Sequence, residues 1–242
     1  MIEVVGLTKR FGPRTALDEV SFTVHPGVVT GFVGPNGAGK TTTMRIIMGL
    51  VHPTAGRAVI NGRRLAAHPA PMRQAGALLD PRCAHPGRTA RDHLRVLAAT
   101  HGIGPVRVEE MIELTGLGPV ADRRVGRFSL GMRQRLGIAG AMLGDPESLV
   151  LDEPVNGLDP DGVVWLRGLL RDLAARGRTV LISSHLMSEL ERTVDHVIVL
   201  GRGKVLADAT RADLVAEGDG LEQVYLRLTG AAVEFRAGEV RR

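Results

Sequence analysis

Eight consecutive residues near the start of the chain combine glycine, lysine and threonine in an order suited to binding phosphate. The run Gly34-Pro35-Asn36-Gly37-Ala38-Gly39-Lys40-Thr41 satisfies every required position of Gly-x4-Gly-Lys-[Ser/Thr]. Glycines let the backbone approach an anion, so that successive N–H groups and the start of the next helix point at phosphate oxygens. Lys40 adds a positive charge, and Thr41 offers a hydroxyl to Mg²⁺. The run therefore predicts a site for a nucleoside triphosphate.

A second stretch that could do chemistry is the carboxylate pair Asp152-Glu153, which follows the apolar run 149–151. In a fold with a phosphate loop, a carboxylate at the end of a buried strand holds Mg²⁺ through water. Its neighbour then polarises a water toward the γ-phosphate. The alternative is a strand that simply ends in an exposed acidic turn before Pro154.

Three further features each have a local structural explanation as well as a chemical one. Ser129 suits the N-cap of the helix expected over 130–143, and a helix start with Ser and Gly131 is also an anion site. Asp159 and Pro160 suit an N-cap and first helical position. His185 follows the strand expected over 180–184, at the edge where ligands collect in open α/β sheets.

The elements that must position these residues follow from hydrophobic periodicity and turn signals. Before the phosphate loop, we expect two antiparallel strands, with Phe11 in the turn between them, and then a buried strand that leads into the loop. After the loop we expect a helix, a hairpin closed by Asn61-Gly62 and one more strand. These elements are expected over 3–7, 16–24, 28–33, 44–50, 57–60 and 75–79.

Between residues 89 and 144 the pattern becomes helical, beginning with Thr89 and Asp92 at capping-box spacing. Strands then alternate with helical periods, which predicts a parallel, doubly wound sheet. Thr210 is expected to cap a further helix. The helices are expected over 94–99, 108–114, 130–143 and 163–173, and the strands over 148–151, 180–183, 197–200 and 204–206.

Composition narrows the class of protein. The net charge is +5, but all but three of the 31 basic residues are arginines spread along the chain, and aromatic residues make up only 3%. We therefore expect no nucleic-acid partner, since few rings are available for base stacking. The single Cys83 excludes an internal disulfide. No apolar run is long enough for a membrane span and no signal peptide is evident, so we expect a cytoplasmic or peripheral protein.

The order of these motifs resembles that of ATP-binding cassette (ABC) ATPases over residues 2–210. The phosphate loop and Asp152-Glu153 are similar to the family's Walker A and Walker B motifs. Ser129-Leu130-Gly131-Met132 resembles its signature, Asp159 its aspartate loop, His185 its switch histidine and Phe11 the aromatic residue that stacks on adenine.

The resemblance implies an α/β fold with a P-loop NTPase (RecA-like) core, an N-terminal antiparallel β-subdomain and an inserted α-helical subdomain over about 85–146. The ATPase domain spans 1–230, and the tail 231–242 is expected to be loosely ordered. The resemblance also implies a head-to-tail dimer that holds two ATP molecules between its subunits and drives a transmembrane permease.

On this resemblance, Glu153 is the general base, His185 steadies the γ-phosphate and Lys40 binds the β- and γ-phosphates, while Thr41 and Asp152 serve Mg²⁺. The residues implied to bind nucleotide are Phe11, Gly34, Pro35, Asn36, Gly37, Ala38, Gly39, Lys40, Thr41, Thr42, Ser129, Gly131 and Asp159.

Two departures from the family pattern stand out. Asp80 occupies the position of a Gln that usually contacts Mg²⁺ and couples to the transporter; Asp80 could still reach the metal through water. The surrounding loop 80–88 is an expected contact with the membrane subunit. Leu130 and Met132 replace the commoner Gly and Gln of the signature.

Of the known groups, the sequence most resembles bacterial drug-export and self-resistance ATPases of the bacitracin and daunorubicin type. This predicts a separate ATPase subunit at the cytoplasmic face of a bacterial membrane. Three alternatives stay open: an importer ATPase, a soluble ABC ATPase acting on DNA or the ribosome, and a nucleotide-binding scaffold without catalysis. The presence of Glu153 disfavours the scaffold.

Overall fold

The computed structural model describes residues 1–82, 84–185, 187–215 and 220–230. Cys83 and the tail 231–242, for which loose order is predicted, lie outside the described residues. Among the described residues, no helix combines the length and apolar character needed to cross a lipid bilayer.

The larger of two sheets has six strands in the order β5-β6-β7-β3-β8-β9. Its first five strands run parallel, as the alternation of strands and helices predicts, and β9 pairs antiparallel with β8. The strands are β3 (Val29–Val33), β5 (Ala75–Leu78), β6 (Ser148–Leu151), β7 (Thr179–Ser183), β8 (His196–Gly201) and β9 (Lys204–Thr210).

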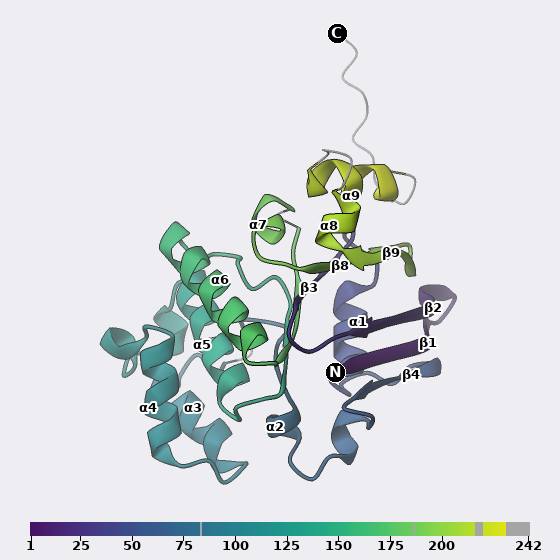
Figure 1. The fold of residues 1–242 in the computed structure, drawn as a ribbon. Helices are drawn as coiled ribbons and strands as arrows, with labels where there is room; N and C mark the ends of the chain where they lie inside the picture. Colours follow the sequence, from purple (N-terminus) through teal and green to yellow (C-terminus); the bar gives the residue numbers. More distant parts are fainter. Residues whose placement is uncertain (83, 186, 216–219, 231–242) are drawn as a thin grey trace.

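Side chains alternate across this sheet and face two separate cores. In β6, Leu149 and Leu151 join a core with the helices on one face, whereas Val150 joins a core with the small sheet on the other. Such two-sided burial explains the continuous apolar runs that marked these strands in the sequence. Figure 1 shows the consequence: the large sheet lies between four helices and the antiparallel strands near the N-terminus. These helices are α3 (Ala90–Ala99), α4 (Pro105–Leu114), α5 (Leu130–Met142) and α6 (Pro160–Ala175).

The small sheet is antiparallel, with the order β2-β1-β4, and comprises β1 (Ile2–Phe11), β2 (Arg14–Val24) and β4 (Ala55–Ile60). Two expectations need correction here. Phe11 is the last residue of β1 and pairs with Arg14, because the turn contains only two residues. The turn at Asn61-Gly62 exists, but β4 pairs along its length with β1, and the predicted hairpin is reduced to one bridge between Ile60 and Arg63.

The helices predicted over 44–50, 94–99, 108–114 and 163–173 begin three or four residues earlier, because their first turns are mostly polar or carry proline, whereas the helix predicted over 130–143 begins at Leu130 as expected. Thr89 caps α3 by accepting a hydrogen bond from the Asp92 N–H at 3.0 Å, as the capping-box spacing predicts. The helices are α1 (Lys40–Ile47), α2 (Pro71–Gln74), α3 (Ala90–Ala99), α4 (Pro105–Leu114), α5 (Leu130–Met142), α6 (Pro160–Ala175), α7 (Met187–Glu191), α8 (Arg211–Leu214) and α9 (Leu221–Thr229).

Helix α5 connects the helical segment to the large sheet and packs closely on the edge strand β5. At Gly76, a Cβ atom would lie 1.8 Å from the carbonyl oxygen of Ala141, so only glycine allows this approach of strand and helix. The position of α5 against the sheet is therefore fixed near the C-terminal end of the helix, where Ala141 is the last residue but one.

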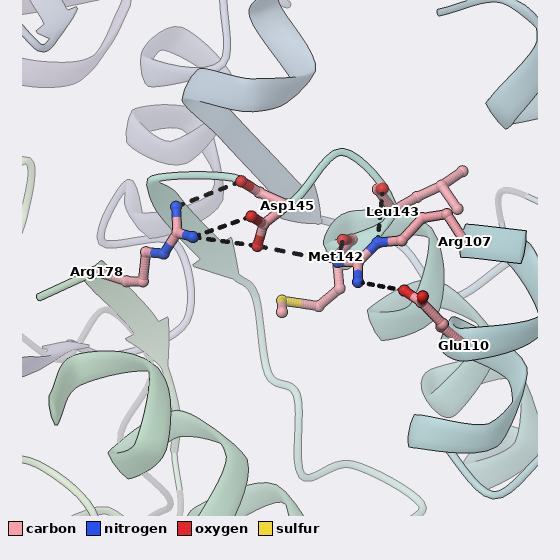
Figure 2. A network of polar contacts seen from close by, with 6 residues as sticks. All are labelled: Arg107, Glu110, Met142, Leu143, Asp145 and Arg178. Carbon is pink, nitrogen blue, oxygen red and sulfur yellow. Dashed lines mark hydrogen bonds and ion pairs between the residues drawn. The ribbon is translucent and has the colours of Figure 1, made fainter. Parts of the chain in front are cut away.

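The C-terminal end of α5 is joined to its surroundings by a polar network (Figure 2). Arg107 of α4 donates hydrogen bonds to the carbonyl oxygens of Met142 at 3.0 Å and Leu143 at 3.3 Å, at the helix end where carbonyl groups lack intrahelical partners, and the Met142 oxygen also accepts from the Asp145 N–H at 3.1 Å. Asp145 accepts from Arg178, just before β7, at 3.1 and 3.2 Å. The network links α4, the end of α5 and the large sheet.

Candidate functional site

The phosphate loop connects the end of β3 directly to α1, which begins at Lys40. Gly39 has φ 108°, and a Cβ atom there would lie 2.5 Å from the side chain of Leu17, so any other residue would be both strained and crowded. The local fold thus leaves the backbone amides of the loop free of bulky side chains at the start of a helix. This arrangement suits an anion.

Lys40 lies inside this loop and is only 8% exposed. Its Nζ donates to the carbonyl oxygens of Gly34 at 2.5 Å and Pro35 at 3.3 Å. Burial lowers the pKa of Lys40, while the negative charges of Glu153 and Asp152 oppose that shift. The structure therefore sets the lysine amine in the field of the two carboxylates predicted to share its site.

Asp152 joins the phosphate loop to the neighbouring strand. Its Oδ2 accepts a hydrogen bond from Thr41 Oγ1 at 2.6 Å, and its Oδ1 accepts from Ser183 Oγ at 2.5 Å. Ser183 was not identified from the sequence. The signal is the parallel register of β6 and β7, which aligns Leu151 with Ile182 and so brings the next residue of each strand together.

Glu153 adopts a left-handed backbone with φ 51°, which is uncommon for a residue other than glycine. Its N–H donates to Ser183 Oγ at 2.8 Å, and its carbonyl oxygen accepts from Gln134 Nε2 at 3.0 Å. The carboxylate Oε2 lies 2.7 Å from His185 Nδ1 and accepts from the His185 N–H at 3.3 Å. Glu153 and His185, 32 positions apart, are thus in direct contact.

The start of α5 contacts the aspartate loop. Ser129 caps α5 by accepting from the Met132 N–H at 3.2 Å, and Asp159 caps α6 by accepting from the Gly162 N–H at 3.0 Å. A Cβ atom at Gly131 would lie 2.4 Å from the carbonyl oxygen of Gly157, so the two segments touch backbone to backbone. The local capping roles inferred for Ser129 and Asp159 are therefore present.

Among the described residues, no hydrogen bond or ion pair joins Ser129, Gly131 or Asp159 to the phosphate loop. Within the chain, the predicted site residues thus fall into two groups. One contains Lys40, Thr41, Asp152, Glu153 and His185, and the other lies at the starts of α5 and α6.

Two predicted residues lie outside both groups. Phe11 is 51% exposed, and Lys9 Nζ lies 4.9 Å from the centroid of its ring. Asp80 accepts hydrogen bonds from Arg82 N at 2.9 Å and Nε at 3.2 Å, and these bonds hold the pKa of the Asp80 carboxyl below its usual range. The contacts described for Asp80 are with Arg82, in the same turn, and do not include Thr41 or Asp152.

Fold and site define a P-loop nucleoside triphosphatase. Residues 17–156 match the family model described as ABC transporter, which covers more than half of the chain. The chain belongs to the ABC transporter family, and as a member it binds ATP and is an ATPase.

Curated relatives carry the same cassette. The chain is 42% identical over 211 residues to the Bacitracin transport ATP-binding protein BcrA of Bacillus licheniformis, covering 86% of this chain and 69% of the relative. It is 36% identical over 208 residues to the Lantibiotic transport ATP-binding protein SrtF of Streptococcus pyogenes, covering 86% and 90%. It is 37% identical over 232 residues to the Nod factor export ATP-binding protein I of Burkholderia lata, covering 93% and 76%.

Solved structures share the fold. The "Structure of ATP binding subunit of ABC transporter" superimposes with a TM-score of 0.86 at 30% identity, covering 95% of this chain and 99% of that one. A dimeric post-hydrolysis state of the ATP-binding cassette MJ0796 bound to ADP and phosphate gives a TM-score of 0.79 at 23% identity, covering 87% and 99%. These likenesses confirm the predicted α/β ATPase fold.

Proposed function

We propose that this chain is the ATP-hydrolysing subunit of a bacterial exporter of drug-like or antibiotic molecules, working at the cytoplasmic face of the membrane with a separate permease. The names of the relatives support this, since they refer to transport of bacitracin and lantibiotics and to export of Nod factor. The ATPase domain is proposed to span 1–230, with the helical subdomain inserted over about 85–146.

The observation that carries the proposal is the contact of Glu153 with His185 beside the Thr41–Asp152 pair. Both contacts of His185 with Glu153, from its N–H and from Nδ1, are to Oε2. The other carboxylate oxygen, Oε1, is therefore the one proposed to take a proton from the attacking water. His185 would orient the carboxylate and face the γ-phosphate. General-base catalysis of this kind contributes about 10²- to 10⁴-fold.

The residues of the loop and of β6 fit Mg²⁺ and ATP. Thr41 Oγ1 and Asp152 Oδ2 lie 2.6 Å apart, and both are oxygen ligands of the kind Mg²⁺ prefers. We propose that they hold the ion, which neutralises phosphate charge when bound. Residues 34–42 would bind the phosphates and Phe11 the adenine. Asp80 is proposed to reach the metal only after releasing Arg82.

The separate group of Ser129, Gly131 and Asp159 supports a head-to-tail dimer of two copies. These residues lie at helix starts, where N–H groups favour anions, and would contact nucleotide held by the partner copy. Leu130, between two of them, is 48% exposed although apolar. A second subunit would cover it.

Replacing Glu153 with Gln tests the catalytic assignment. The purified Glu153→Gln protein should bind ATP but hydrolyse it about 10²-fold or more slowly, and it should form a longer-lived ATP-dependent dimer in size-exclusion chromatography. Glu113→Gln is the matched control, since Glu113 is an exposed carboxylate of α4. Unchanged turnover of Glu153→Gln would remove Glu153 from the role of base.

Export is tested first by reading the adjacent reading frame, which should encode a permease with about six membrane spans, and then by expressing the chain with and without that protein. The chain should sediment with membranes only when the permease is present, and the pair should lower accumulation of a bacitracin-like peptide in cells. Co-purification with nucleic acid or ribosomes instead of membranes would favour the soluble alternative, and uptake would favour an importer.

A further inference from the structure

Gln134 is a buried residue of α5 whose amide contacts the catalytic segment. Its side chain is 1% exposed, and Nε2 donates to the carbonyl oxygen of Glu153 at 3.0 Å. Its own Oε1 has no hydrogen-bond partner among the residues that the structure describes. A buried amide oxygen without a partner is unfavourable, whereas a hydrophobic side chain of similar size would avoid that cost. An amide at this position therefore indicates that the hydrogen bond donated by Nε2 to Glu153 has a role.

The Gln134 Nε2 group bonds to a backbone segment whose conformation is unfavourable on its own. Glu153 has φ 51°, a conformation that residues with a Cβ atom rarely adopt unless the surroundings hold them there. Ser183 of β7 holds the N–H of Glu153, while its carbonyl oxygen accepts from Gln134 of α5 at 3.0 Å and from the Asn156 N–H of its own turn at 3.2 Å. Because both groups flanking the Glu153 Cα atom are held, the direction of its Cα–Cβ bond is fixed as well.

The same helix also carries the residues that face the second subunit in the proposed dimer. Gln134 lies about one turn after Leu130 and Gly131. Gly131 touches the Gly157 carbonyl group, and the side chain of Leu130 lies where a Cβ atom of Gly157 would be. A movement of the start of α5 would therefore reach Glu153 through the Gln134 amide.

We propose that Gln134 is a positioning residue: it orients Glu153 for proton transfer and so links engagement of α5 by the second subunit to the hydrolytic site of its own chain. This inference rests on the proposed role of Glu153 as general base. It assigns Gln134 no contact with nucleotide.

The first test is Gln134→Met, which keeps the length and unbranched shape of the side chain but removes the donor. We expect kcat to fall about tenfold or more while the KM for ATP stays within about twofold, because orientation of the base is lost and binding is not. Gln134→Leu should behave in the same way and serves if the Met variant does not fold. Met142→Leu, a buried change in the same helix, is the control and should keep wild-type turnover.

The second test separates positioning from a general effect on α5. In the Glu153→Gln background, adding Gln134→Met should leave the ATP-dependent dimer unchanged, because the only group that Gln134 orients has already been disabled. A weaker dimer would show that Gln134 acts by supporting the signature helix, and this would overturn the proposal. Wild-type kcat in folded Gln134→Met would overturn it too.

Failure of the proposed function would look different. If Glu153→Gln alone kept its turnover, the general-base assignment would fail whatever Gln134 does. If Glu153→Gln lost turnover and Gln134→Met did not, only the positioning role would fail.

Discussion

The two ends of α5 are attached to the rest of the molecule by different kinds of contact. At the start of the helix, Gln134 bonds to the Glu153 backbone inside the protein, and Gly131 touches the Gly157 carbonyl group. At the end of the helix, Asp145 and its arginine partners form ion pairs, and the Asp145 side chain is 66% exposed (Figure 2). The helix has 13 residues and is therefore about 20 Å long.

The two kinds of contact differ in how strictly they fix the position of the helix. Buried contacts to backbone atoms allow one arrangement, because a small displacement leaves polar groups unpaired or makes atoms overlap. Exposed ion pairs are screened by water and salt and tolerate displacement, and each contributes about 0 to 1 kcal/mol. The contacts of Gln134 and Gly131 therefore fix the start of α5 more strictly than the Asp145 ion pairs fix its end. At the far end, the strict contact is instead the close approach of Ala141 to Gly76.

Arg135 further restricts the position of the first half of α5. Its guanidinium donates to the Thr115 carbonyl oxygen at 3.0 Å, and its Cζ atom lies 4.6 Å from the centroid of the Trp165 ring. Trp165 Nε1 in turn donates to the Leu114 carbonyl oxygen at 3.1 Å. The C-terminal end of α4 is thus joined to α5 and α6 next to the aspartate loop.

The largest effect is expected from breaking the catalytic end with Gly131→Ala. The new Cβ atom would lie 2.4 Å from the Gly157 carbonyl oxygen, and since both partners are backbone, the start of α5 or the aspartate loop must shift. Overpacking of this kind costs about 1–3 kcal/mol of stability. We expect ATPase activity to fall by more than about tenfold, measured beside the free energy of unfolding in urea.

Gly168→Ala is the matched control for this change. Gly168 lies in α6, is exposed, and has no atom within 4 Å of an added Cβ. Alanine should leave activity unchanged and raise stability by up to about 1 kcal/mol, because glycine is a poor helix residue. Full activity in Gly131→Ala would mean that the contact with Gly157 does not determine the geometry of the site.

The local motifs could be predicted from the sequence because each consists of neighbouring residues whose types determine the local backbone structure. The phosphate loop, the strand before Asp152 and the caps at Thr89 and Thr210 all occur where they were expected. The family resemblance predicts that Glu153 and His185 share one site, and their direct contact is what the structure adds.

What the sequence could not give is the set of contacts that depend on three-dimensional approach. Ser183 looks like the end of a strand, and Gln134 like a polar residue in a helix, until β6, β7 and α5 are placed together. The turn signal at Gly12-Pro13 predicts Phe11 in the turn, whereas Phe11 is the last residue of β1, and the hairpin predicted at 57–62 is replaced by pairing of β4 with β1. Pairing between distant segments is not encoded in local periodicity.

The smallest effect is expected at the far end of α5, from Asp145→Asn. Asparagine keeps the shape of the side chain and accepts the left-handed backbone, with φ 50° at this position, so only the charge is removed. Loss of the ion pairs with Arg178 and Arg107 should lower the free energy of unfolding by less than about 1 kcal/mol and leave ATPase activity within about twofold. Denaturation in urea at low and high salt provides the measurement.

High salt should remove most of the difference between Asp145→Asn and the wild type, because salt already screens exposed pairs in the native protein. Asp172→Asn, at an exposed carboxylate of α6, provides the control for a simple change of net charge. If Asp145→Asn lowered activity as much as Gly131→Ala, the far end of α5 would have to specify the site as strictly as the catalytic end.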